Sequence, residues 1–110
     1  STLIEEIKEA LPEVKIMIME PFVLKGDATE NTEEYPDKWA IFSTEVKKRA
    51  IKAREIAEKH HLSFIPLQEK FEEAATLAAN SYWLRDGVHP TTAGHELIKR
   101  EWIKCLNEII

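Results

Sequence analysis

The stretch Val14-Lys15-Ile16-Met17-Ile18-Met19 decides the fold class of this chain. All but one of its residues are apolar, and they lack the strict alternation of a strand that has one face in water. A short, nearly continuous apolar run predicts a strand buried on both faces, as in a parallel sheet. Glu20-Pro21 ends this strand. A second short apolar run, Leu62–Leu67, predicts another strand, and Pro66 marks its end or a sheet edge.

Helices are predicted wherever apolar residues recur at helical spacing. The expected ranges are 2–10, ending before Pro12; Asp37 to about His60, with Asp37 as the N-cap; 68–80; and Thr91 or Thr92 to about Asn107. Helices alternating with strands indicate an α/β fold with a parallel crossover connection. The polar residues 24–37 are expected to form a lid or a disordered tip, and residues 80–90 a second loop. Trp39, Trp102 and Cys105 lie on apolar helical stripes and are expected in the core.

The predicted sheet is incomplete. Two parallel strands do not make a stable sheet by themselves, and the first is apolar on both faces, so it needs neighbours that this chain lacks. We therefore expect a fragment of a larger α/β domain. The alternative is a chain that borrows strands from a partner or from a second copy.

Length and charge limit the function classes. The 110 residues allow one small domain, and the net charge of −5 argues against nucleic acid or an anionic membrane as the main partner. No apolar run approaches the roughly 20 residues of a membrane span. The single cysteine, Cys105, excludes an internal disulfide and slightly favours the cytoplasm. The compartment stays unknown, because a signal peptide lost with an N-terminal segment would leave the same sequence.

The stretch Asp86-Gly87-Val88-His89-Pro90 carries the chemistry. A Gly- and Pro-containing loop turns sharply, so a carboxylate three residues before an imidazole can accept a hydrogen bond from the Nδ1–H of that ring. This bond leaves Nε2 free to take a proton from a nucleophile. Asp86 is thus predicted to orient the ring and His89 to act as general base. A bare Asp-x-x-His pair is more often structural.

Two stretches resemble one family. Asp86-Gly-Val-His-Pro-Thr-Thr-Ala-Gly-His95 is similar to the C-terminal signature of the SGNH (GDSL-type) hydrolases, which are esterases and acylhydrolases, and Ile16–Phe22 is similar to one of their late core strands. The resemblance implies a flavodoxin-like, three-layer α/β domain with a five-stranded parallel sheet. Residues 1–110 then form the C-terminal half of that single domain, with two strands plus helices. The Gly-Asp-Ser block with the nucleophile has no counterpart here.

The implied activity is serine-dependent hydrolysis of a carboxylic ester, without a metal or organic cofactor. The ester is a small molecule, and acetylated carbohydrate fits the long polar loop and the nearby aromatic residues. A lipid or another short-chain ester is the alternative. Glu20 and Phe22 follow the carboxyl end of a strand, where open α/β sheets bind ligands, and Trp83 precedes the Asp-His loop. These three residues are predicted to line the substrate cleft. The alternatives are a solvated Glu20 at a strand end and core packing of Trp83.

The nucleophile is missing from the sequence. Ser1, Ser43, Ser63 and Ser81 lie in neither a Gly-Asp-Ser nor a Gly-x-Ser-x-Gly context. The missing N-terminal half, or a second chain that completes the sheet, is therefore the expected partner, and the isolated chain is expected to be inactive. One rival function is a non-enzymatic fragment that pairs with another chain. A metal site from Asp86, His89, His95 and Glu96 matches no compact zinc spacing.

Overall fold

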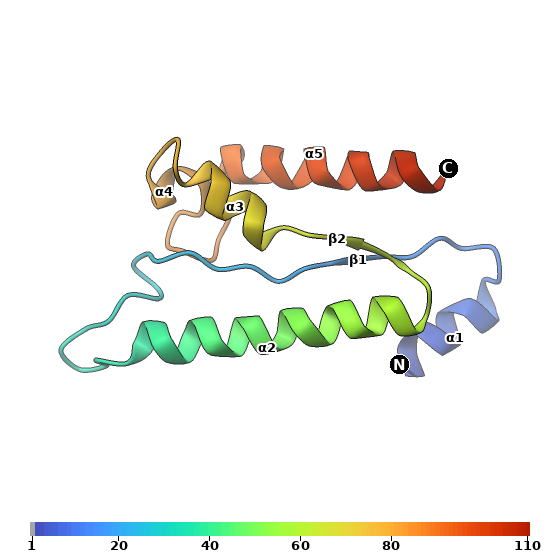
Figure 1. The fold of residues 1–110 in the computed structure, drawn as a ribbon, viewed down its shortest axis with the longest axis horizontal. Coiled ribbons are helices and arrows are strands. Elements are labelled where there is room, and N and C mark those ends of the chain that lie inside the picture. The colour runs from blue at the N-terminus through green and yellow to red at the C-terminus, as the bar shows by residue number, and fades with distance from the viewer. Residues whose placement is uncertain (1) are drawn as a thin grey trace.

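The structure is a computed structural model that describes residues 2–110 (Figure 1). In chain order its elements are α1 (Thr2–Ala10), β1 (Met17–Met19), α2 (Lys38–Lys59), β2 (Ser63–Ile65), α3 (Gln68–Ala74), α4 (Asn80–Trp83) and α5 (Thr92–Ile109). The alternation of helices and strands confirms the predicted α/β class. Within residues 2–110, no helix is both long enough and apolar enough to cross a membrane.

The two strands form a parallel pair, as predicted. Met17 is in register with Ser63, and Met19 with Ile65. Both strands are shorter than predicted, with 3 residues each. Pro66 has no N–H to continue the ladder. The amino-terminal part of the first run has no neighbouring strand among the described residues, and Val14 is 40% exposed.

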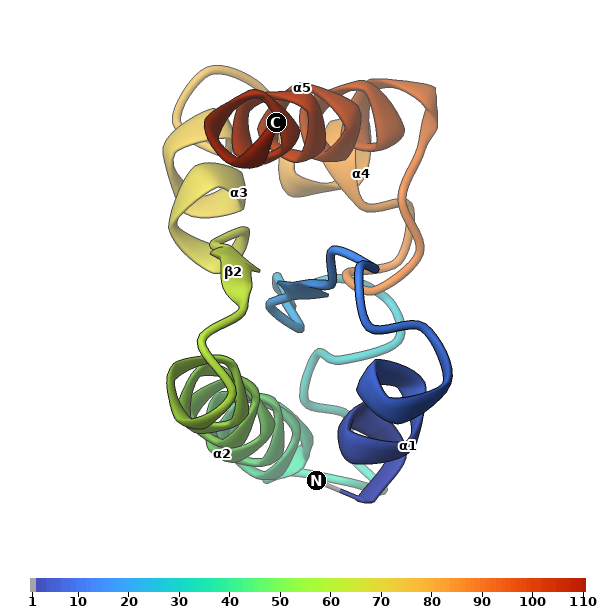
Figure 2. The same ribbon diagram turned by 90° about the vertical axis from the view of Figure 1, so that its right-hand side faces the viewer.

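The helices cover the sheet from two sides. Figure 2 shows α1 and α2 on one side of the strands, and α3, α4 and α5 on the other. The core lies mainly between the sheet and α5, where the buried residues are Leu24, Ile65, Leu67, Phe71, Leu84 and Cys105. In α1 and α2 only Ile4 and Ala57 are buried. One face of the sheet is therefore well packed, and the other is thinly covered.

Three helical residues were predicted to lie in the core, and the structure buries them to different extents. Cys105 is buried as expected, but Trp102 is 40% exposed, so its placement in the core is wrong. A sheet of two strands is too narrow to cover the whole apolar stripe of α5, which leaves Trp102 in water. Trp39 is partly buried, and the Nζ of Lys25 lies 5.6 Å from the centre of its ring.

The helix expected over 68–80 is wrong beyond Ala74. The hydroxyl of Thr76 donates to the carbonyl oxygen of Glu73 at 2.6 Å, and such side-chain bonds compete with helix continuation. Ala79 is extended, with ψ of 151°, and α4 then begins at Asn80 inside the segment expected to be a loop. The helix therefore breaks into two short ones, and the second leads directly into the Asp-His stretch.

Candidate active site

Asp86 and His89 contact each other as predicted. The Nδ1 of His89 lies 2.7 Å from the Oδ2 of Asp86. The other carboxylate oxygen, Oδ1, accepts the backbone N–H groups of Val88 at 3.0 Å and of His89 at 2.9 Å. The side chain of Asp86 is 20% exposed and that of His89 is 66% exposed. The carboxylate is thus held within the turn, while the imidazole stands at the surface.

Electrostatics keep this carboxylate ionised. The backbone N–H of His89 lowers the pKa of Asp86 most, and the N–H of Val88 and the His89 side chain lower it further against the opposing effect of burial. An ionised Asp86 accepts a hydrogen bond from the Nδ1–H of His89 and so favours the tautomer in which Nε2 carries no proton. The geometry suits a general base whose ring is oriented by a carboxylate.

We expect the stability of this turn to depend on acid through Asp86. Because the folded protein lowers the pKa of Asp86, the stabilisation is fully present above its ordinary value of 3.8 and is lost as the pH falls below it. Asp86→Asn should therefore be less stable than the wild type at pH 7, and the gap should narrow between about pH 4 and pH 2. Denaturant unfolding at several pH values measures this gap, with the exposed Asp27→Asn as control. A gap that is constant with pH would contradict the assignment.

The loop that carries the pair is closed at its base. Leu84 and Pro90 form an isolated antiparallel bridge, and the N–H of Arg85 donates to the carbonyl of His89 at 2.8 Å. Thr91 is the N-cap of α5, because its hydroxyl oxygen accepts the N–H of Gly94 at 3.1 Å. The same hydroxyl donates to the carbonyl of Tyr82 at 2.6 Å. Thr91 therefore ties α4 and α5 together at the foot of the loop.

The loop after β1 supports the site from the other side. The N–H of Leu24 donates to the carbonyl of Gly87 at 2.9 Å, and the N–H of Ala28 donates to the carbonyl of Asp86 at 2.9 Å. Leu24 and Thr29 are buried. For residues 24–30 the prediction of a lid or a disordered tip is therefore wrong, since backbone hydrogen bonds to Asp86 and Gly87 hold this part of the loop. We call residues 23–30 the supporting loop.

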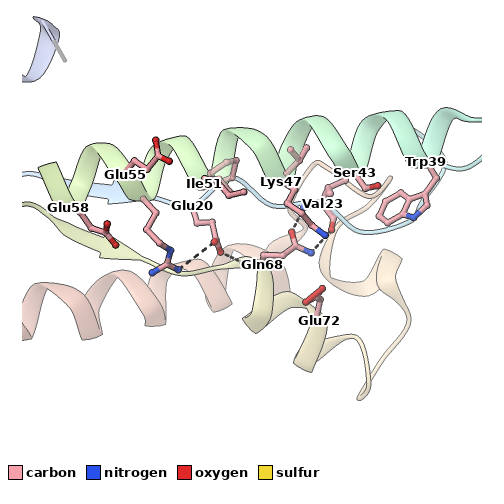
Figure 3. Close-up of a pocket in the computed structure, with 14 residues that line it drawn as sticks. Glu20, Val23, Trp39, Ser43, Lys47, Ile51, Glu55, Glu58, Gln68 and Glu72 are labelled. Atoms are coloured by element: carbon pink, nitrogen blue, oxygen red, sulfur yellow. Dashed lines mark hydrogen bonds and ion pairs between the residues drawn. The ribbon is translucent and has the colours of Figure 1, made fainter.

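Glu20 holds the start of α3. Its Oε1 accepts the N–H groups of Leu67 at 2.9 Å and of Gln68 at 2.8 Å, and its Oε2 lies 3.9 Å from Arg54 (Figure 3). The Glu20 side chain is only 13% exposed, so a solvated Glu20 is wrong. It lines a hollow of about 580 Å³ between α2 and α3. Its expected role in a substrate cleft stays a prediction.

The two aromatic residues expected near the substrate are partly buried. The rings of Phe22 and Phe71 have centroids 4.6 Å apart, and Phe22 packs against the core. Trp83 also packs against the core, and Tyr82 meets it edge to face at 4.9 Å. The Nε1 of Trp83 is buried without a hydrogen-bond partner among residues 2–110. Contact of either residue with a substrate stays a prediction.

Among residues 2–110, no serine forms a hydrogen bond with His89. The hydroxyl of Ser43 donates to the carbonyl of Ala40 at 3.4 Å within α2, Ser63 lies in β2, and Ser81 lies in α4. Ser1 is outside the described residues. Glu96 pairs with Lys99 and Arg100, and the residues from 2 to 110 contain no group of three metal-binding side chains.

Comparisons with solved structures show which proteins this chain resembles. No family model and no curated protein matches the sequence. A solved structure from Parabacteroides merdae, described as a GDSL-like lipase, is similar with a TM-score of 0.75 and 32% identity. An acetylxylan esterase from Geobacillus stearothermophilus is similar with a TM-score of 0.67 and 26% identity. The matches cover 94% of this chain but only 44% and 43% of those chains. Over nearly its whole length, this chain therefore resembles somewhat less than half of an SGNH (GDSL-type) hydrolase.

Proposed function

We propose that this chain supplies the Asp-His part of a Ser-His-Asp triad in a serine ester hydrolase. The observation that carries the proposal is the 2.7 Å contact between the Nδ1 of His89 and Asp86, with the His89 ring at the surface. Residues 1–110 are the C-terminal part of one flavodoxin-like, three-layer domain in this proposal. The resemblance to a lipase and an esterase supports it.

In the reaction, His89 moves a proton twice. Its Nε2 takes the proton of the serine hydroxyl while the serine oxygen bonds to the ester carbonyl carbon. Asp86 stabilises the imidazolium, which then gives that proton to the leaving alcohol as the ester C–O bond breaks. Water attacks the resulting acyl-serine in the same way, with His89 again as base. Asp86 stays ionised throughout, as its lowered pKa favours.

The serine and the oxyanion donors come from the N-terminal half of the domain, outside this chain. Two solved structures described as catalytic mutants of the Geobacillus esterase replace a serine in one case and a histidine in the other by alanine. That pairing supports a serine as the partner of His89. Acetylated carbohydrate is the proposed substrate class, since the same relative is described as an acetylxylan esterase. Glu20, Phe22 and Trp83 are proposed to shape the cleft.

The free edge of β1 supports a partner that adds strands. The N–H of Glu20 donates to Ile65 of β2, so the alternate residues Met17 and Met19 direct their backbone groups away from β2. These groups have no partner strand among residues 2–110. The apolar side chain of Met19 in this strand is 43% exposed. The edge is therefore suited to a further parallel strand from the missing half.

The weak burial of α2 supports the same partner. This helix has 22 residues, of which only Ala57 is buried. A long helix normally covers a continuous apolar stripe. A wider sheet would cover more of that stripe. The rival function, a non-enzymatic chain that pairs through its edge, shares this surface but needs no serine near His89.

A fluorophosphonate probe, which labels activated serines, tests the proposal. The protein is purified from the cells that produce it, and its intact mass is measured before and after labelling. We expect the adduct on a companion species, or on a longer chain that contains these residues. A sample that holds only the 12.7 kDa chain and stays unlabelled would overturn the enzymatic function and leave the pairing module.

A further inference from the structure

We propose that Thr29 is a positioning residue for the Asp-His pair, acting through the backbone of the supporting loop. The inference rests on the proposed function of Asp86 and His89, and it concerns which residue keeps this pair in position. Thr29 is fully buried, and it is the only buried polar residue among residues 2–110. A polar side chain removed from water in this way must be completely hydrogen-bonded.

The hydroxyl of Thr29 joins two points of the supporting loop. It donates to the carbonyl of Leu24 at 2.9 Å and accepts the N–H of Gly26 at 3.0 Å. The backbone N–H of Thr29 also donates to the carbonyl of Gly26 at 2.9 Å. One hydroxyl therefore closes residues 24–29 into a single compact turn, using both its donor and its acceptor capacity.

This turn forms hydrogen bonds with two consecutive backbone carbonyls of the Asp86–Pro90 stretch. Leu24 and Ala28, on either side of Gly26, donate their N–H groups to Gly87 and Asp86. There is little room for these segments to shift, since a Cβ atom on Gly26 would lie 2.4 Å from the carbonyl carbon of Asp86. A displacement of the turn therefore moves the backbone of Asp86 and Gly87.

The backbone conformation of Gly87 links the position of the supporting loop to the orientation of the His89 ring. Its φ of +100° turns the chain so that the N–H groups of Val88 and His89 reach the Oδ1 of Asp86. Those bonds orient the carboxylate whose Oδ2 contacts the Nδ1 of His89. Loss of the Thr29 hydroxyl should loosen Gly87, then the carboxylate, and finally the tautomer preference of the ring.

The test compares Thr29→Val with Thr29→Ser. Valine has nearly the shape of threonine but no hydroxyl, and serine keeps the hydroxyl. The fraction of neutral His89 that carries its proton on Nδ1 is read from imidazole ¹⁵N chemical shifts in the protein as purified. We expect a clear fall in this fraction for Thr29→Val, the wild-type fraction for Thr29→Ser, and unchanged signals from His61 and His95.

The matched control is Thr32→Val in the same connection between β1 and α2. The hydroxyl oxygen of Thr32 accepts the N–H of Tyr35 at 2.9 Å at the surface, away from Asp86. This variant should leave the His89 signals unchanged. If Thr29→Val lowers thermal stability while the Nδ1–H fraction of His89 stays at the wild-type value, Thr29 is only a packing residue and the inference is wrong.

A second measurement covers the case in which Thr29→Val does not fold. In the wild type, the backbone amides of Leu24 and Ala28 and those of Val88 and His89, which bond to Asp86, should exchange with solvent through one shared opening. Faster independent exchange of the Val88 and His89 amides overturns the inference. Neither readout uses esterase activity, so a failure of the proposed function and a failure of this inference are distinguishable.

Discussion

Replacing His89 by alanine is expected to lower kcat/KM of the proposed ester hydrolase by about 10⁴-fold or more, because it removes the group proposed to take the serine proton. The change removes a side chain that is 66% exposed, so stability should change little. Initial rates on an acetyl ester and the rate of fluorophosphonate labelling measure the effect. Both should fall together, since both depend on deprotonation of the same serine.

The control is His95→Ala, which removes an exposed histidine from the first turns of α5. It should retain near-wild-type rates. Asp86→Ala should cost less than His89→Ala, because the base remains and only its orientation and charge compensation are lost. An assembled enzyme that keeps its activity without His89 would exclude this histidine as the base.

Replacing Gly87 by alanine is expected to destabilise the protein by about 3 kcal/mol or more. The φ of +100° is unfavourable for any residue with a Cβ atom, and here that atom would lie 2.4 Å from the carbonyl oxygen of Leu24. Backbone cannot yield as a flexible side chain does, so the supporting loop would have to separate from the Asp-His turn. For a domain of this size the melting temperature should fall by more than about 10 °C.

Asp27→Ala is the matched control for Gly87→Ala. Asp27 is exposed and lies in the same supporting loop, and its removal should change the free energy of unfolding by less than about 0.5 kcal/mol. Thermal unfolding followed by circular dichroism compares the variants. Equal melting temperatures for Gly87→Ala and the wild type would show that the turn and the loop are not rigidly joined.

Features that depend on residues near each other in the chain could be predicted from the sequence. The apolar run before Glu20 indicated a strand, but its expected burial on both faces is wrong for residues 2–110, where Met19 is 43% exposed. The three-residue spacing of Asp86 and His89 indicated their contact. Thr91 or Thr92 was expected as a cap, and Thr91 is the cap because its side chain acts on an N–H only three residues away. The last two interactions are local, so the pattern of residue types contains them.

Features that join distant segments were not predicted. Residues 24–37 looked like a lid because most of them are polar, although the apolar residues Val23 and Leu24, just before and at the start of this segment, indicated partial burial. Glu20 was expected to face a ligand or water, whereas its carboxylate accepts the N–H groups at the start of α3. The sequence indicated this role of Glu20 only indirectly, because Leu67 stands at the N-cap of α3 and has no side-chain acceptor for the N–H groups there. Such a helix start needs an acceptor from elsewhere in the fold.

The bonds between the supporting loop and the Asp-His turn also bear on how the protein folds. Helix α2 is built from contacts within one segment, which form early and fast. The turn at Asp86 needs residues from the other end of the sequence, and closing that long loop costs entropy before any bond repays it. We therefore expect the geometry of the Asp-His pair to form late on the folding pathway. Partly folded chains would have helical content before the Asp86 carboxylate orients the His89 ring.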